Sequence, residues 1–258
     1  MKSVCIKKCG ILVLWFMLPL GNALGTNAAF TNLLARADRI EKDGNLAGML
    51  MIYGEAQRQG AGNAGALCEL AKRYCDLTYL TASKTAQKDC MARALACAEQ
   101  AVKDDPQSAT AHTSLAICYA KSCMYADIKG QLTYSRAFKA EAEKAITLDP
   151  RQDLAYYLLG RWNYGMAGIG RFSRAYARVV YGGLPKASFQ DAVLNFRKAV
   201  ELSPNRVINH AGLAMAYEAV GENKQAVVEW QKCCAMTPLG PEDLEARQDA
   251  EKKLAGSK

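Results

Sequence analysis

Ten cysteines and two histidines are the residues of this 258-residue sequence best suited to chemistry. Four of the cysteines form two pairs with seven-residue spacing: Cys68 with Cys75, and Cys90 with Cys97. Seven residues are almost two helical turns, so each pair would share one helix face. The two members would then lie about 10.5 Å apart along the axis, too far to share one zinc ion. We therefore expect no metal site.

The histidines and glycines form no catalytic or cofactor-binding pattern. His112 and His210 have no cysteine or carboxylate at nucleophile or metal spacing. Gly165, Gly168 and Gly170 lack the third glycine of a dinucleotide fingerprint, and no strand precedes them. We interpret the glycines as a hinge and the histidines as packing residues. The sequence predicts no catalytic residues, no enzyme activity and no cofactor.

The N-terminus has the layout of a secretory signal peptide, predicted over residues 1–25. Lys2, Lys7 and Lys8 precede a short apolar run at 11–18. This run is well below the roughly 20 residues that a spanning helix needs. We therefore expect an exported chain, periplasmic or secreted, with no stable membrane span. A signal anchor, an organelle lumen and the intermembrane space are the alternatives.

The charge balance bears on partners. A formal net charge of +8 is a modest excess that favours solubility. No basic stripe interleaved with aromatic residues and no zinc-finger spacing is present. We expect no nucleic-acid partner.

Internal repeats indicate the fold class. Helix-like segments end in Asp-Pro or Ser-Pro at Pro106, Pro150 and Pro204, and a fourth copy ends at Pro238. Successive prolines lie 44, 54 and 34 residues apart, and 34 is the period of the tetratricopeptide unit. Small residues would lie where helices cross, and each proline would end a second helix. The larger spacings would carry insertions.

The last full unit, with Leu213, Ala214, Tyr217, Gly221 and Trp230, resembles the tetratricopeptide repeat. We therefore predict an all-α tetratricopeptide-repeat α-solenoid of about five helical hairpins plus a C-terminal capping helix. It would occupy residues 26–258, with units and cap at 31–63, 64–108, 109–152, 153–206, 207–240 and 241–256.

Residues 64–238 also resemble the regulator of microtubule dynamics family. The resemblance rests on Leu158-Leu159-Gly160-Arg161-Trp162, on Gly182-Gly183-Leu184-Pro185 and on the helix from Phe189 to Ala199. It implies a helical repeat protein, linked to microtubules or organelle contacts, without catalytic residues. Because an exported chain cannot meet cytosolic microtubules, we transfer the fold and not the tubulin partner.

The repeat register predicts a binding groove, because first helices of the repeat family line its concave side. The expected groove residues are Leu154, Tyr157, Arg161, Tyr164, Ile208 and Met215. An arginine between two tyrosines could grip a carboxylate or phosphate while the rings supply apolar contact. The alternative is that the fourth-unit insertion covers these groups.

That insertion predicts an amphipathic helix. Arg171, Arg174 and Arg178 share one face, and apolar residues share another. One hypothesis is a lid whose arginines meet an anionic ligand, either an acidic peptide or a lipid headgroup. The alternative is a docked structural helix with solvated arginines.

Two functions remain open for the solenoid. It would be a non-enzymatic scaffold that takes a protein or peptide partner into its groove. Alternatively, the groove and the 171–180 helix would enclose an apolar ligand such as a lipid.

Export would permit disulfide bonds. Facing residues of an antiparallel hairpin have a constant sum of residue numbers, and Ala71 with Ala94, Cys68 with Cys97, and Cys75 with Cys90 share one sum. We therefore predict two parallel disulfides, Cys68–Cys97 and Cys75–Cys90, with free buried thiols as the alternative. We predict no bond for the remaining Cys118, Cys123, Cys233 and Cys234.

Overall fold

The computed structural model describes residues 28–41 and 44–256, so the predicted signal peptide lies outside the described residues. Within these ranges the chain forms α-helices, one short 3₁₀ turn at Cys123–Tyr125 and no strand. The helices pair as five antiparallel hairpins: α1 (Ala28–Glu41) with α2 (Leu46–Gln59), α3 (Ala64–Leu77) with α4 (Lys84–Asp104), α5 (Ala109–Ser122) with α6 (Ile128–Leu148), α7 (Asp153–Ala167) with α9 (Phe189–Leu202), and α10 (Val207–Val220) with α11 (Asn223–Ala235).

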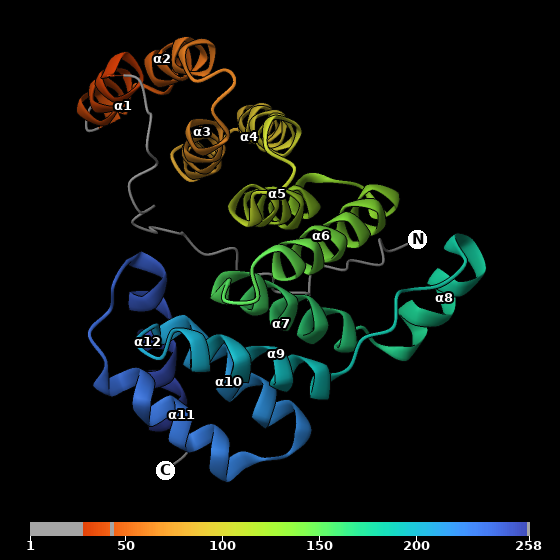
Figure 1. The fold of residues 1–258 in the computed structure, drawn as a ribbon. Helices are drawn as coiled ribbons and strands as arrows, with labels where there is room; N and C mark the ends of the chain where they lie inside the picture. The colour runs from red at the N-terminus through yellow and green to blue at the C-terminus, as the bar shows by residue number, and fades with distance from the viewer. Residues whose placement is uncertain (1–27, 42–43, 257–258) are drawn as a thin grey trace.

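Two further helices complete the fold. In the sequence, helix α8 (Arg171–Tyr181) comes between the two helices of the fourth hairpin, and α12 (Pro241–Ala255) follows the fifth hairpin. Figure 1 shows the hairpins stacked in chain order, with α12 folded back beside α10 and α11 and α8 projecting from the stack. The predicted all-α solenoid of five hairpins with a C-terminal capping helix is confirmed.

Local sequence signals set where the helices begin and end. The side chains of Asn63, Ser83 and Ser108 accept hydrogen bonds from the amide three residues on, which satisfies a free donor at each helix start. Helices α4, α6 and α9 end two residues before the prolines of the repeated Asp-Pro or Ser-Pro pairs. Proline lacks the N–H that another helical turn would need. The chain must therefore reverse there and start the next hairpin.

Phe196 of α9 is wedged between two glycines on neighbouring helices. The ring is buried, and it meets the ring of Tyr157 edge-on with a centroid distance of 5.7 Å. A Cβ on Gly160 of α7 would lie 2.7 Å from the Phe196 ring, and one on Gly212 of α10 would lie 2.5 Å from it. Only glycine at both positions lets α7 and α10 pack directly against this ring. The ring also contacts Tyr157 and so orients it.

The cysteines correct one prediction. The two predicted disulfides are not formed in the structure, where all four thiols are free: Cys68, Cys97, Cys75 and Cys90. Cys75 of α3 shares a hydrogen bond with Cys118 of α5, and Cys68 shares one with Ser114 of α5. The thiols of Cys68 and Cys75 thus bond to α5, although Cys75 also lies in one buried cluster with Cys90 and Cys97 of α4. Burial raises the pKa of Cys68 to about 11, so this thiol stays protonated at neutral pH.

The glycine contact yields a stability prediction. Gly212→Ala should lower the free energy of unfolding by about 1–3 kcal/mol, because the added methyl group overpacks the Phe196 ring. Gly54→Ala in α2 is the matched control, since its Cβ would meet nothing within 4 Å. The control should gain up to about 1 kcal/mol from helix propensity. Urea denaturation measures both, and equal stability of the two variants would contradict the wedge.

The thiols yield a second prediction. Reductant should leave the melting temperature of the full chain unchanged, because the four thiols are already free. Two native disulfides would instead each stabilise the fold by about 2–5 kcal/mol, which reductant would remove. Alkylation after denaturation without reductant should label all eight cysteines of the described residues. A fall of several degrees on reduction, or recovery of Cys68 linked to Cys97, would restore the disulfide hypothesis.

Candidate functional site

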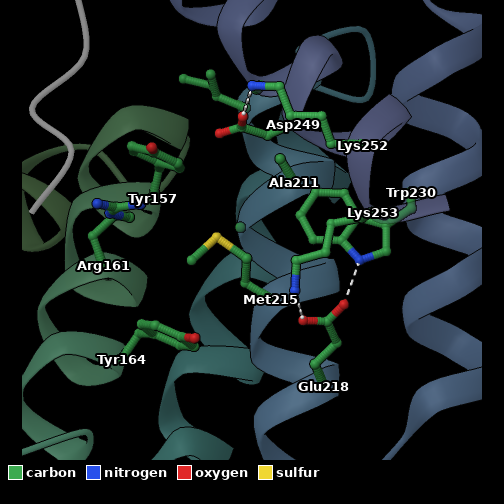
Figure 2. Close-up of a pocket in the computed structure, with 13 residues that line it drawn as sticks. Tyr157, Arg161, Tyr164, Ala211, Met215, Glu218, Trp230, Asp249, Lys252 and Lys253 are labelled. Atoms are coloured by element: carbon green, nitrogen blue, oxygen red, sulfur yellow. Dashed lines mark hydrogen bonds and ion pairs between the residues drawn. The ribbon is translucent and has the colours of Figure 1, made fainter. Parts of the chain in front are cut away.

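A cavity of about 400 Å³ lies where the fourth and fifth hairpins meet α12. Three helices of the solenoid and the C-terminal helix contribute its walls (Figure 2). The lining residues are Tyr157, Arg161 and Tyr164 of α7, Ile208, Ala211, Gly212, Met215 and Glu218 of α10, Trp230 of α11, and Ala246, Asp249, Lys252 and Lys253 of α12.

The structure brings five of the six predicted groove residues together around this cavity: Tyr157, Arg161, Tyr164, Ile208 and Met215. Figure 2 shows the first three one above another along α7, across the cavity from Met215. The sixth, Leu154, is buried in the core and does not line the cavity. Five of the six residues selected by the repeat register thus line one cavity, while their predicted role in binding stays a prediction.

Helix α12 forms a wall that the sequence interpretation treated only as a cap. At its start, the Asp243 carboxylate accepts hydrogen bonds from the backbone N–H groups of Ile208 and Leu239, both at 3.0 Å. A carboxylate at the start of α10 also interacts favourably with the helix dipole. Because α12 is tied to the first turn of α10, its remaining turns lie along the cavity.

The far end of α12 is held by a charged chain of contacts. Lys253 pairs with Glu218 of α10 at 2.7 Å, and the same carboxylate accepts a hydrogen bond from the Trp230 indole N–H at 2.8 Å. Figure 2 shows both contacts beside the cavity. The sequence signal for this wall was the spacing of Ala246, Asp249 and Lys253 along one helix face.

The cavity combines aromatic walls with charged side chains, most of which pair with one another: Glu218 with Lys253, and Asp249 with Lys252. Tyr157 and Trp230 are buried, and Tyr164 and Met215 are half-buried. Burial raises the pKa of Tyr157 although Arg161 acts in the opposite direction, so its phenol is neutral at physiological pH. Lys252 pairs with Asp249 at 3.1 Å. Such a lining suits an apolar group that carries one nearby charge.

Helix α8 does not behave as the predicted lid. None of its residues lines the cavity, and Figure 1 shows it projecting away from α12. Its Arg174 donates hydrogen bonds to the carbonyl oxygens of Met166 and Ile169 at the end of α7. This arginine therefore anchors α8, while Arg171 and Arg178 lie exposed. Helix α8 therefore does not help to enclose an apolar ligand in the groove, as the alternative function had predicted.

The two histidines connect the helices of their hairpins. His112 Nδ1 lies 2.5 Å from Glu141 Oε2, and its Nε2 lies 3.1 Å from the carbonyl oxygen of Pro106. His210 makes the same contacts in the fifth hairpin, with Glu229 at 2.5 Å and with the preceding proline carbonyl at 2.9 Å. Both ring nitrogens of each histidine are thus occupied. Within the described ranges, no group of three or more potential ligands could hold a metal ion.

These pairings were missed in the sequence. The signal was a glutamate at the same repeat position in both units, one residue before Ala142 and one before Trp230. A histidine recurs at the fourth position of the facing helix in the same two units. The pairs support the packing role predicted for the histidines.

The Glu229 pair predicts a pH dependence. Burial alone would raise the pKa of Glu229, but its hydrogen bonds with His210 and Lys232 outweigh burial and lower that pKa. The ionised Glu229 carboxylate therefore stabilises the fold fully when the pH is above 4.5, the ordinary pKa of a glutamate. This stabilisation is lost as the pH falls through the lowered pKa of the folded state. Glu229→Gln should lower the free energy of unfolding by about 1–3 kcal/mol at pH 7.

The difference between wild type and Glu229→Gln should shrink below pH 4.5 as Glu229 is protonated. Urea denaturation across pH measures it. Glu201→Gln, at an exposed ion pair, is the control and should stay within about 0.5 kcal/mol of wild type. A difference that is constant with pH would contradict the role of the Glu229 charge.

Comparisons with known proteins show the family of this chain. Residues 33–258 match the family described as "Regulator of microtubule dynamics protein 1-3". The chain is 30% identical over 210 residues to regulator of microtubule dynamics protein 3 of Xenopus laevis, which covers 79% of this chain and 43% of that protein. It is 27% identical over 234 residues to protein 1 of Mus musculus, covering 89% and 75%.

Solved structures give the same fold. A thermophilic TPR protein of Thermus thermophilus superposes with a TM-score of 0.59 at 17% identity, covering 88% of this chain and 99% of that one. At this identity the likeness bears on the fold alone. The chain spans less than half of the Xenopus relative, so the activity of that longer protein is not transferred as a whole.

The relatives also correct the predicted location. They are named as regulators of microtubule dynamics, and microtubules are intracellular polymers, so the prediction of an exported, periplasmic or secreted chain is wrong. No helix among the described residues has the length and apolar character needed to cross a bilayer. With a match that extends from residue 33 to residue 258, the chain belongs to the regulator of microtubule dynamics family.

Proposed function

We propose that this chain is a non-enzymatic scaffold that binds a protein or peptide partner in the cavity between α7, α10 and α12. The observation that carries the proposal is the convergence of residues from four separate helices on one aromatic cavity. Cavities of this size are typical of sites for small groups or for a few side chains of a partner.

The lining indicates the chemistry of the partner. Tyr157, Tyr164 and Trp230 supply rigid aromatic surface, and Met215 adapts its shape to irregular apolar groups. Arg161 adds a planar cation that suits a carboxylate. The favoured ligand is therefore a peptide segment that inserts an apolar side chain and carries an acidic residue beside it.

Tubulin is the first partner to test, because the relatives are named as regulators of microtubule dynamics. Because this chain belongs to the same family, we include tubulin in the proposal as its partner. The cavity accounts for how a helical scaffold without a catalytic constellation would act: it would hold a tubulin segment by surface complementarity.

Met215→Glu tests the cavity. The substitution places a carboxylate among apolar lining groups, opposite Arg161 and near Glu218, so it should weaken binding to microtubules at least about tenfold. Met51→Glu on α2 is the matched control, because Met51 is 77% exposed and far from the lining. Co-sedimentation with purified microtubules measures the affinities, and circular dichroism checks that both variants fold.

The result has three readings. Loss with Met215→Glu and wild-type affinity with Met51→Glu supports the cavity. Equal microtubule affinity of all three chains would overturn it. If the wild-type chain does not sediment with microtubules, tubulin is excluded as the partner.

A further inference from the structure

Helix α8 presents its apolar side chains to solvent. Phe172 is 95% exposed, Val179 is 85% exposed, and Tyr176 and Val180 are about half exposed. Only Ala177 of this helix is buried. An amphipathic helix of a solenoid normally turns its apolar stripe toward the core. The reversed orientation of α8 therefore leaves a binding surface without a partner in the described chain.

The orientation is set by specific contacts. Ala177 and Arg174 face the body of the protein, and Arg174 is bonded to the carbonyl oxygens that end α7. Phe172, Tyr176 and Val179 lie four and three residues apart, which puts them on one stripe of the opposite face. This outward apolar stripe is a consequence of how α8 is anchored.

The charged side chains of the chain segment that contains α8 all have one sign. No Asp or Glu occurs between Asp153 and Asp191. Arg171, Arg178 and Lys186 lie exposed on or just after the helix. A helix with an apolar face flanked only by cations complements a surface that is apolar beneath a negatively charged layer.

The size of the stripe argues against a stable protein complex on α8 alone. An 11-residue helix is about 16 Å long, and one face of it offers about 300 Å². A stable protein interface buries about 800 Å² per partner. A bilayer needs only a few inserted apolar side chains and nearby cations.

We propose that α8 docks on the surface of a bilayer that contains anionic lipids. Phe172, Tyr176 and Val179 insert at the boundary of the acyl chains, and Arg171 and Arg178 contact lipid phosphates. The helix lies flat in the interface and does not span it. This site is independent of the cavity, to which α8 contributes no residue.

Vesicle flotation with the full chain tests the apolar stripe. Vesicles of phosphatidylcholine with phosphatidylserine should bind the wild-type chain, and the double variant Phe172→Ser, Val179→Ser should bind at least about tenfold more weakly. The double variant Leu194→Ser, Val228→Ser is the matched control, since both residues are exposed on other helices. It should bind as the wild type does. The N-terminal residues are identical in every chain, so differences report on the substitutions.

The arginines have a separate signature. Arg171→Gln, Arg178→Gln should lower binding to phosphatidylserine-containing vesicles by about thirtyfold and leave binding to pure phosphatidylcholine unchanged. Raised salt should weaken the wild type more than this variant.

Insertion can be read directly. Phe172→Trp should show added tryptophan fluorescence that vesicles of brominated lipid quench, beyond any quenching of the wild type. Flotation that is the same for wild type and both α8 double variants, or no added quenching at position 172, would overturn the proposal. Self-association that the Phe172→Ser, Val179→Ser substitutions abolish, without any effect on flotation, would instead assign the stripe to a second copy of the chain.

Discussion

The contact of Phe196 with two glycines is the constraint on which the cavity depends. The ring fills the space between α7 and α10, and any side chain at Gly160 or Gly212 would collide with it. Close packing of this kind tolerates little change in volume. The distance between α7 and α10 therefore fixes how far the α7 side chains stand from Met215 and Ala211 on the other wall.

Helix α12 converts that spacing into a bounded site. Asp243 ties its first turn to the start of α10, and Lys253 ties its last turn to Glu218. Neither contact could form if α10 were displaced along the stack. Helix α8 is anchored differently, through Arg174 at the end of α7, and Figure 1 shows it on the other side of the fourth hairpin from α12. The two proposed surfaces can thus be occupied at the same time.

The sequence predicted the repeats well because proline positions and helix periodicity are local signals. The 54-residue spacing between Pro150 and Pro204 indicated an insertion, which the structure has as α8. The 44-residue spacing before it corresponds to a longer second helix, α6, with 21 residues against 14 in α9. The groove register followed from the same periodicity, and it identified Tyr157, Arg161 and Met215.

The failures concern rotation and long-range contacts. Constant sums of residue numbers bring Cys75 level with Cys90, but they do not say which way α3 is rotated, and the Cys68 and Cys75 thiols bond to α5. Nothing local in the last helix shows that Lys253 reaches Glu218, 35 residues earlier. The amphipathic pattern of α8 was read correctly, but a pattern does not reveal whether its apolar stripe faces the core or solvent.

Hydrogen exchange of the full chain, with and without saturating microtubules, tests most directly whether the cavity holds the partner. Binding in the cavity should slow amide exchange in α7, α10 and α12 and leave exchange in α4 and α6 nearly unchanged. Protection confined to α4 and α6, with α7, α10 and α12 unaffected, would contradict binding in the cavity.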